Sequence, residues 1–150
     1  MKDPELKAGL KGIIALVPAT VHPNAVPSNY KSMYKAHHDI AKDSPVIDKE
    51  SMDTFFREMQ IDPKDSGYFT LLAEENHHLF PPTYIAVCEY DPLRDDGFAM
   101  QKALEEKGVK TKLDYWSGLP HYFWIFPQLQ ESAEFMGKML AGIEWVKSQM

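Results

Sequence analysis

The chain has 150 residues, of which 44% are hydrophobic and 25% are charged, as expected for one soluble domain with a core of its own. Its formal net charge of −6 argues against nucleic acid or an anionic membrane surface as a main partner. No apolar run reaches the roughly 18 residues that a membrane helix needs. The first residues carry no signal-peptide pattern, and the one cysteine, Cys88, has no partner within the chain for a disulfide. We therefore expect a cytoplasmic protein.

The first half of the chain predicts one strand followed by two helices. The run GIIALVPA, from Gly12, is continuously apolar, which predicts a strand that is buried on both faces. Ser28 can cap a helix that ends before Pro45, with apolar positions at helical spacing at Tyr30, Met33, Tyr34, His37, Ile40 and Ala41. Asp48 can cap a second helix, whose apolar face carries Met52, Phe55, Phe56 and Met59.

The second half predicts two more strands, each followed by a helix. PPTYIAVCEYD, which ends at Asp91, is a second buried strand, and Asp95 or Asp96 can cap a helix from Gly97 to Lys107. VKTKLDYW alternates apolar and polar residues, as a half-exposed edge strand does. A last helix is predicted from about Gln128 to Lys147, with an apolar stripe of Leu129, Ala133, Met136, Leu140 and Ile143.

Strands that alternate with helices indicate an α/β fold built from parallel βαβ units with right-handed crossovers. A sheet of only three strands is a partial doubly wound sheet. Its first strand is expected at an open edge without a partner.

Asp91 and His121 are the strongest candidates for chemistry, because each follows a predicted strand. Functional groups gather at the carboxyl ends of the strands in doubly wound sheets. An Asp there can accept a hydrogen bond from a histidine ring nitrogen and orient the ring as a general base. Both residues also have structural explanations, since Asp before Pro starts many turns and a loop histidine is common.

Metal and nucleotide sites have little support in the sequence. His37–His38 and His77–His78 are adjacent pairs, which point about 100° apart on a helix and do not form an i, i+4 ligand pair. There is no C-x-x-C motif and no glycine-rich phosphate loop. We expect no metal and no organic cofactor.

The stretches DPLRDDG and GLPHYF together resemble the C-terminal half of α/β-hydrolases of the hormone-sensitive-lipase-like branch, which includes carboxylesterases and many fungal enzymes of secondary metabolism. The resemblance covers nearly the whole chain. It implies Asp91 as the acid and His121 as the general base of a catalytic triad. It also implies a helical cap insertion at about residues 23–65, in which Tyr34, Phe55 and Phe56 line a substrate pocket. Without the resemblance, ordinary packing between helices is the simpler explanation for these three aromatic residues.

The chain departs from that family in one respect. The nucleophile of such enzymes lies in a G-x-S-x-G elbow and the oxyanion hole in an upstream glycine-rich loop. Neither motif occurs here, and none of the serines stands in that context: Ser28, Ser32, Ser44, Ser51, Ser66, Ser117, Ser132 and Ser148. We therefore expect one α/β-hydrolase domain over residues 1–150 that is incomplete at its N-terminus.

Three hypotheses follow. The chain is part of a serine carboxylic-ester hydrolase for a small-molecule ester, inactive alone and completed by a missing N-terminal half. Alternatively, it is a non-catalytic binding or assembly protein that reuses half the fold and pairs with a partner or with another copy of itself through the open sheet edge. The third hypothesis is a dimeric enzyme in which Asp91 and His121 perform non-hydrolytic acid–base chemistry, such as an isomerisation or cyclisation.

Overall fold

The computed structural model describes residues 9–40 and 44–150. Within them, three parallel strands form one sheet in the order β1 (Ile13–Leu16), β2 (Thr83–Tyr90) and β3 (Thr111–Pro120). The long connection from β1 to β2 contains the short helix α2 (Ala36–Asp39) and the helix α3 (Lys49–Met59). Helix α4 (Arg94–Glu106) joins β2 to β3, and α5 (Gln130–Ser148) ends the chain. The predicted α/β class and partial parallel sheet are confirmed.

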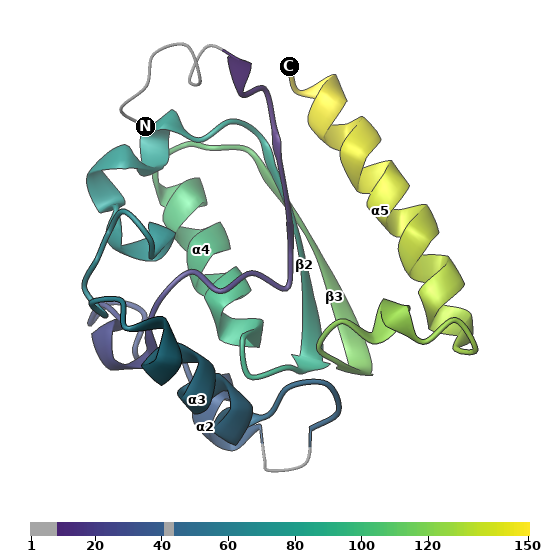
Figure 1. Ribbon diagram of the computed structural model, residues 1–150. Helices are drawn as coiled ribbons and strands as arrows, with labels where there is room; N and C mark the ends of the chain where they lie inside the picture. The colour runs from purple at the N-terminus through teal and green to yellow at the C-terminus, as the bar shows by residue number, and fades with distance from the viewer. Residues whose placement is uncertain (1–8, 41–43) are drawn as a thin grey trace.

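Helices α4 and α5 cover opposite faces of the sheet (Figure 1). A Cβ added at Gly97 of α4 would lie 2.2 Å from Cγ1 of Val87, so α4 packs closely on one face of β2. A Cβ added at Gly142 of α5 would lie 2.7 Å from the ring of Tyr84, whose side chain points to the other face. Both close approaches require a residue without a side chain, and they make β2 the buried centre of the sheet.

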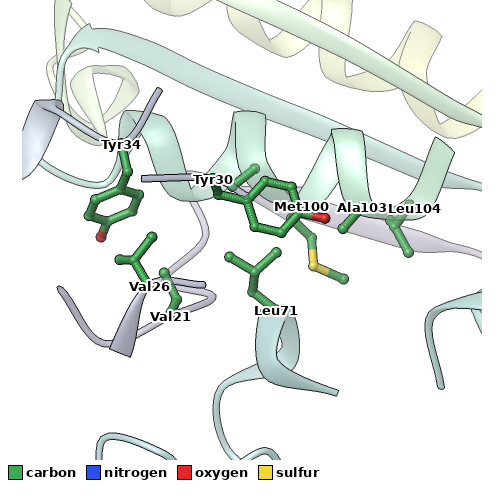
Figure 2. Close-up of a cluster of buried hydrophobic side chains, with 9 residues drawn as sticks. Val21, Val26, Tyr30, Tyr34, Leu71, Met100, Ala103 and Leu104 are labelled. Carbon is green, nitrogen blue, oxygen red and sulfur yellow. The ribbon is translucent and has the colours of Figure 1, made fainter. Parts of the chain in front are cut away.

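Beyond α4 lies the connection between β1 and β2, which forms an additional layer. A buried cluster joins the two, with Tyr30, Tyr34 and Leu71 of the connection facing Met100 and Leu104 of α4 (Figure 2). A second cluster, under α5, is built around Tyr84, Cys88, Trp116, Phe123 and Phe135. The core is therefore divided by the sheet, and the connection is held to the sheet through α4.

The prediction for β1 is partly wrong. Within the described chain β1 pairs only with β2, so it does lie at an edge of the sheet as expected. It is not buried on both faces, because Ile14 is 37% exposed. Ile14 is in register with Tyr84 and shares its face, which α5 covers over β2 but not fully at the edge.

The helix predicted from Ser28 is also wrong. Only Ala36–Asp39 is α-helical there, preceded by turns, and Ala41 lies outside the described residues. The backbone N–H groups of Lys35 and Ala36 both donate to Oδ2 of Asp95, at 2.6 Å. This contact from α4 replaces the intrahelical bonds that a continuous helix would make. One helical turn remains, with Tyr34 N–H donating to the Tyr30 carbonyl, so both tyrosines stay on the buried side.

Two details of the later helices differ from the predictions. Helix α4 begins at Arg94, and the residue at its N-cap is Leu93 rather than Asp95 or Asp96. On α5 the predicted stripe is wrong, because Met136 and Leu140 are 49% and 58% exposed. The buried face of α5 carries Ser132, Phe135, Gly142 and Val146. The predicted helix α3 is confirmed, and Asp48 caps it by accepting the N–H of Ser51.

Candidate active site

Asp91 and His121 form a hydrogen-bonded pair at the carboxyl end of the sheet. Nδ1 of His121 lies 2.8 Å from Oδ2 of Asp91. The other carboxylate oxygen, Oδ1, accepts the backbone N–H of Leu93 at 2.8 Å. Asp91 is fully buried, whereas the His121 side chain is 15% exposed. An ionised carboxylate only accepts, so His121 donates from Nδ1 and its Nε2 carries the free lone pair of a general base.

The chain brings the two residues together because they follow neighbouring parallel strands. Asp91 comes directly after β2 and His121 directly after β3, and these strands pair along their length up to Tyr90 and Pro120. Their carboxyl ends meet at one edge of the sheet (Figure 1). A register shift between Cys88 and Tyr90 marks a bulge in the ladder just before the two candidate residues.

Glu89 shapes the turn that leads to His121, and it was not among the residues predicted from the sequence. Its Oε2 accepts the hydroxyl of Ser117 at 2.6 Å and the backbone N–H of Gly118 at 2.7 Å. These two bonds lower the pKa of Glu89 below its ordinary value. Gly118 has φ +76, a left-handed conformation that favours glycine, and the turn it makes directs the chain toward His121. The signal in the sequence is a carboxylate two residues before Asp91 at a strand end.

We expect Glu89→Ala to loosen this turn without unfolding the protein. The N–H of Gly118 loses its acceptor, so its hydrogen exchange should become faster by about tenfold or more. Hydrogen exchange read by NMR measures this directly. Glu105→Ala is the matched control, because Glu105 is another exposed carboxylate with side-chain partners, Gln101 and Thr111. Equal Gly118 exchange in wild type and Glu89→Ala would show that Glu89 does not hold the turn.

Asp95 and Asp96, at the start of α4, bind the connection between β1 and β2. Oδ1 of Asp96 accepts the backbone N–H groups of Thr20 and Val21 at 2.7 and 3.0 Å. Its Oδ2 accepts the Tyr34 hydroxyl at 2.7 Å. Asp96 is fully buried, and this burial raises its pKa to about 7, although the hydrogen bonds from Thr20, Tyr34 and Val21 oppose the change. Asp91, Asp95 and Asp96 thus each accept N–H groups of the main chain.

The three aromatic residues predicted to line a substrate pocket lie in different surroundings. Tyr34 is buried and bound to Asp96, and burial beside this carboxylate raises its pKa. Phe55 is 56% exposed on α3. Phe56 is buried against Met52, Phe69 and Leu93. Their role in substrate binding remains a prediction.

Phe56 does line a cavity of about 560 Å³ between α2, α3 and the turn at Pro23–Ala25. His37 also lines it, almost fully buried, with Nε2 3.0 Å from Oδ1 of Asp53. Burial lowers the pKa of His37. Neither Asp91 nor His121 is among the residues that line this cavity.

Comparison with known proteins decides the family. A family model described as the α/β-hydrolase fold matches residues 2–125, most of the chain. The chain belongs to the α/β-hydrolase fold family. The partial parallel sheet with helices agrees with this membership.

This α/β-hydrolase chain is similar to fungal esterases. It is 57% identical to a versiconal hemiacetal acetate esterase of Dothistroma septosporum, over 99% of the chain and 45% of that protein. The crystal structure of a vibralactone cyclase matches it with a TM-score of 0.90 and 31% identity, over 98% of the chain and 43% of the cyclase. The thermostable carboxylesterase EstE1 shares the fold, with a TM-score of 0.73 and 20% identity. The chain spans slightly less than half of the length of each of these three proteins.

The described part of the hydrolase chain offers no cluster of three or more His, Cys, Asp or Glu side chains for a metal ion. Among the same residues, no helix is both long enough and apolar enough to cross a membrane.

Proposed function

We propose that this chain supplies the acid and the general base of a serine carboxylic-ester hydrolase. Asp91 is the acid and His121 the base, in an enzyme for a small-molecule ester. The observation that carries the proposal is the 2.8 Å contact between Nδ1 of His121 and Oδ2 of Asp91 in a member of the α/β-hydrolase family. The similarity to a versiconal hemiacetal acetate esterase supports an ester as the substrate.

His121 acts in both halves of the reaction. Its Nε2 takes the proton of a serine hydroxyl as the serine oxygen attacks the ester carbonyl, and then gives this proton to the leaving alcohol. In the second half, Nε2 takes a proton from water as the water oxygen attacks the acyl carbon. It then gives this proton to the serine oxygen as the bond between that oxygen and the acyl carbon breaks, which releases the acid and restores the serine. Asp91 holds the tautomer with a proton on Nδ1 and stabilises the imidazolium at each step.

The nucleophile lies outside these 150 residues in this proposal. Ser117 is the serine nearest to His121 in the sequence, but its hydroxyl donates to Glu89 at 2.6 Å. No G-x-S-x-G elbow surrounds it. Without a nucleophile and an oxyanion hole, the pair of Asp91 and His121 lacks the covalent route and the largest electrostatic contribution. The chain alone is therefore inactive on esters.

A chimera tests the proposal. In it, this chain replaces the segment of the Dothistroma esterase that it matches, which is feasible at 57% identity. We expect this chimeric hydrolase to hydrolyse 4-nitrophenyl acetate, and we expect the chain alone not to do so. His121→Ala should abolish the activity, whereas His78→Ala, at an exposed histidine, should preserve it. A folded chimera that loses nothing with His121→Ala would contradict the proposal.

The similarity to a vibralactone cyclase favours a second candidate, a cyclisation that uses the same acid–base pair. In this case the chain, alone or as a dimer, would act on a substrate without hydrolysis, and the activity would depend on both Asp91 and His121. A stable oligomer whose properties are the same in wild type and His121→Ala would instead indicate an assembly protein.

A further inference from the structure

Tyr122 has a backbone conformation that its side chain does not favour. It has φ 58 and ψ 28, in the left-handed region, which glycine adopts without strain and large side chains rarely adopt. It directly follows His121. Unusual backbone of this kind persists only where the surrounding structure holds it, and it concentrates at functional sites.

The neighbours of Tyr122 fix this conformation. On one side, His121 is held by Asp91. On the other, Phe123 is fully buried in the cluster under α5. The Tyr122 carbonyl accepts the N–H of Ile125 at 3.2 Å, and its own N–H is directed to the thiol of Cys88, whose pKa burial raises to about 12. These contacts hold the main chain at Tyr122 on both sides.

The ring of Tyr122 is an exposed plane beside the imidazole. It lies nearly parallel to the His121 ring, with 25° between the planes and 6.0 Å between the centroids. It also contacts Trp124, with centroids 4.7 Å apart. Trp124 in turn stacks on the buried ring of Phe135 at 3.9 Å and 4°. The plane is thus supported by the core, yet Tyr122 remains 42% exposed.

Packing within these 150 residues does not account for this combination. A side chain that served the core would be buried, and an exposed position in the left-handed region is better filled by glycine or asparagine. A rigid aromatic side chain loses little conformational entropy when a flat ligand packs on it. Offset or tilted stacking at such distances is the favoured geometry between aromatic groups.

We propose that Tyr122 is a specificity-determining residue that stacks on a planar aromatic group of the ester, in its acyl or its alcohol part, next to His121. This inference rests on the proposed hydrolase function and deepens it by naming a substrate class: aromatic esters are preferred over aliphatic esters of the same size.

Two pairs of esters and three variants of the chimeric hydrolase test this preference. Benzyl acetate is compared with cyclohexylmethyl acetate, and methyl benzoate with methyl cyclohexanecarboxylate. In Tyr122→Gly, we expect the aromatic-to-aliphatic ratio of kcat/KM to fall about threefold to tenfold for at least one pair, which is what an aromatic contact contributes. Tyr122→Phe retains the plane and should retain the ratio.

Gln60→Gly is the matched backbone control. Gln60 also has a left-handed conformation, with φ 52, at the C-cap of α3, and it lies in none of the contacts around His121. It should leave the ratio unchanged. Because glycine suits the left-handed region, we expect the melting temperature of Tyr122→Gly to be equal to or above that of wild type. An unchanged ratio in Tyr122→Gly, or a lower melting temperature with an equal loss on both esters of a pair, would overturn the inference.

A binding measurement separates this inference from the proposed function. If the chimera hydrolyses none of the esters, the proposed function fails. Tyr122 is then tested by NMR shifts of its ring on titration with benzyl alcohol and with cyclohexylmethanol, and with benzoate and cyclohexanecarboxylate. Tighter binding of an aromatic ligand than of its aliphatic partner, lost in Tyr122→Gly, supports the inference. Equal binding within both pairs overturns it.

Discussion

We expect Asp91→Asn to lower the kcat of the chimeric hydrolase about 10⁴-fold, the loss that follows when a triad histidine is held in the wrong tautomer. Asparagine has the shape of aspartate, and its carbonyl can still accept the N–H of Leu93 from the position of Oδ1. Its amide would then donate to Nδ1 of His121, which moves the ring proton to Nε2. With a proton on Nε2, the ring cannot act as a base toward serine.

Asp114→Asn is the matched control for this substitution. Asp114 lies on β3 and accepts the hydroxyl of Tyr84 at 2.7 Å, so it is also an aspartate bound to a ring substituent. Its replacement should leave kcat within about twofold, as expected for a residue outside the reaction. Steady-state kinetics on 4-nitrophenyl acetate, with circular dichroism to verify folding, measures both variants. Comparable losses in the two would show that Asp91 has no special role.

The second large effect concerns the stability of the fold. At pH 5 we expect Asp96→Ala to lower the free energy of unfolding of the chimeric hydrolase by about 3–5 kcal/mol, since it leaves buried donors unpaired. These donors are the N–H groups of Thr20 and Val21, and the hydroxyl of Tyr34 loses its hydrogen-bond partner as well. Urea denaturation measures the change. Asp65→Ala is the control, because the Asp65 side chain is exposed and accepts the N–H of Gly67 from its own turn.

The pH dependence of stability should also depend on Asp96. Burial raises its pKa to about 7 in the folded protein, from 3.8 for an unperturbed aspartate. The folded state therefore holds a proton that the unfolded state releases above about pH 4. Unfolding should become easier as the pH rises from about 4 to about 7, by on the order of 4 kcal/mol. A protonated Oδ2 can donate to Tyr34 while Oδ1 still accepts both amides.

Asp96→Asn should remove this part of the pH dependence, because asparagine does not titrate. The difference in unfolding free energy between wild type and Asp96→Asn, measured by urea denaturation between pH 4 and 8, isolates the contribution of Asp96 from that of other groups. A difference that stays constant over this range would mean that Asp96 is ionised throughout in the folded protein.

Local patterns predicted those elements whose cause is local. Helix α3 follows from Asp48, whose capping contact with Ser51 spans three residues. Strands β2 and β3 follow from runs of apolar or alternating residues, and the proximity of Asp91 and His121 follows from parallel topology.

Contacts between distant segments caused the errors. The helix predicted from Ser28 does not form because the carboxylate of Asp95, about sixty residues away, accepts the backbone N–H groups of Lys35 and Ala36. The face of α5 is chosen by Phe135, which stacks on Trp124, and by Gly142, which admits the ring of Tyr84. Met136 and Leu140 are apolar enough for the buried face of α5, but they lie on its exposed face. The roles of Glu89 and Tyr122 depend on turns whose geometry no spacing rule encodes.

The contacts of Asp95 and Asp96 divide the connection between β1 and β2 into fixed and replaceable parts. Thr20, Val21, Lys35 and Ala36 are fastened to the start of α4, next to the Asp91 turn. The N–H of Leu71 donates to the Thr20 carbonyl at 3.0 Å, which fastens the far end to the same point. Between these anchors, residues 37–70 form a loop whose two ends are held close together, with α3 inside it. A protein engineer who wants a new specificity can exchange this loop as a cassette if the replacement keeps its two contacts beside the acid of the candidate triad. These are the packing of Phe56 on Leu93 and the hydrogen bond from the Ser44 hydroxyl to the Tyr90 carbonyl.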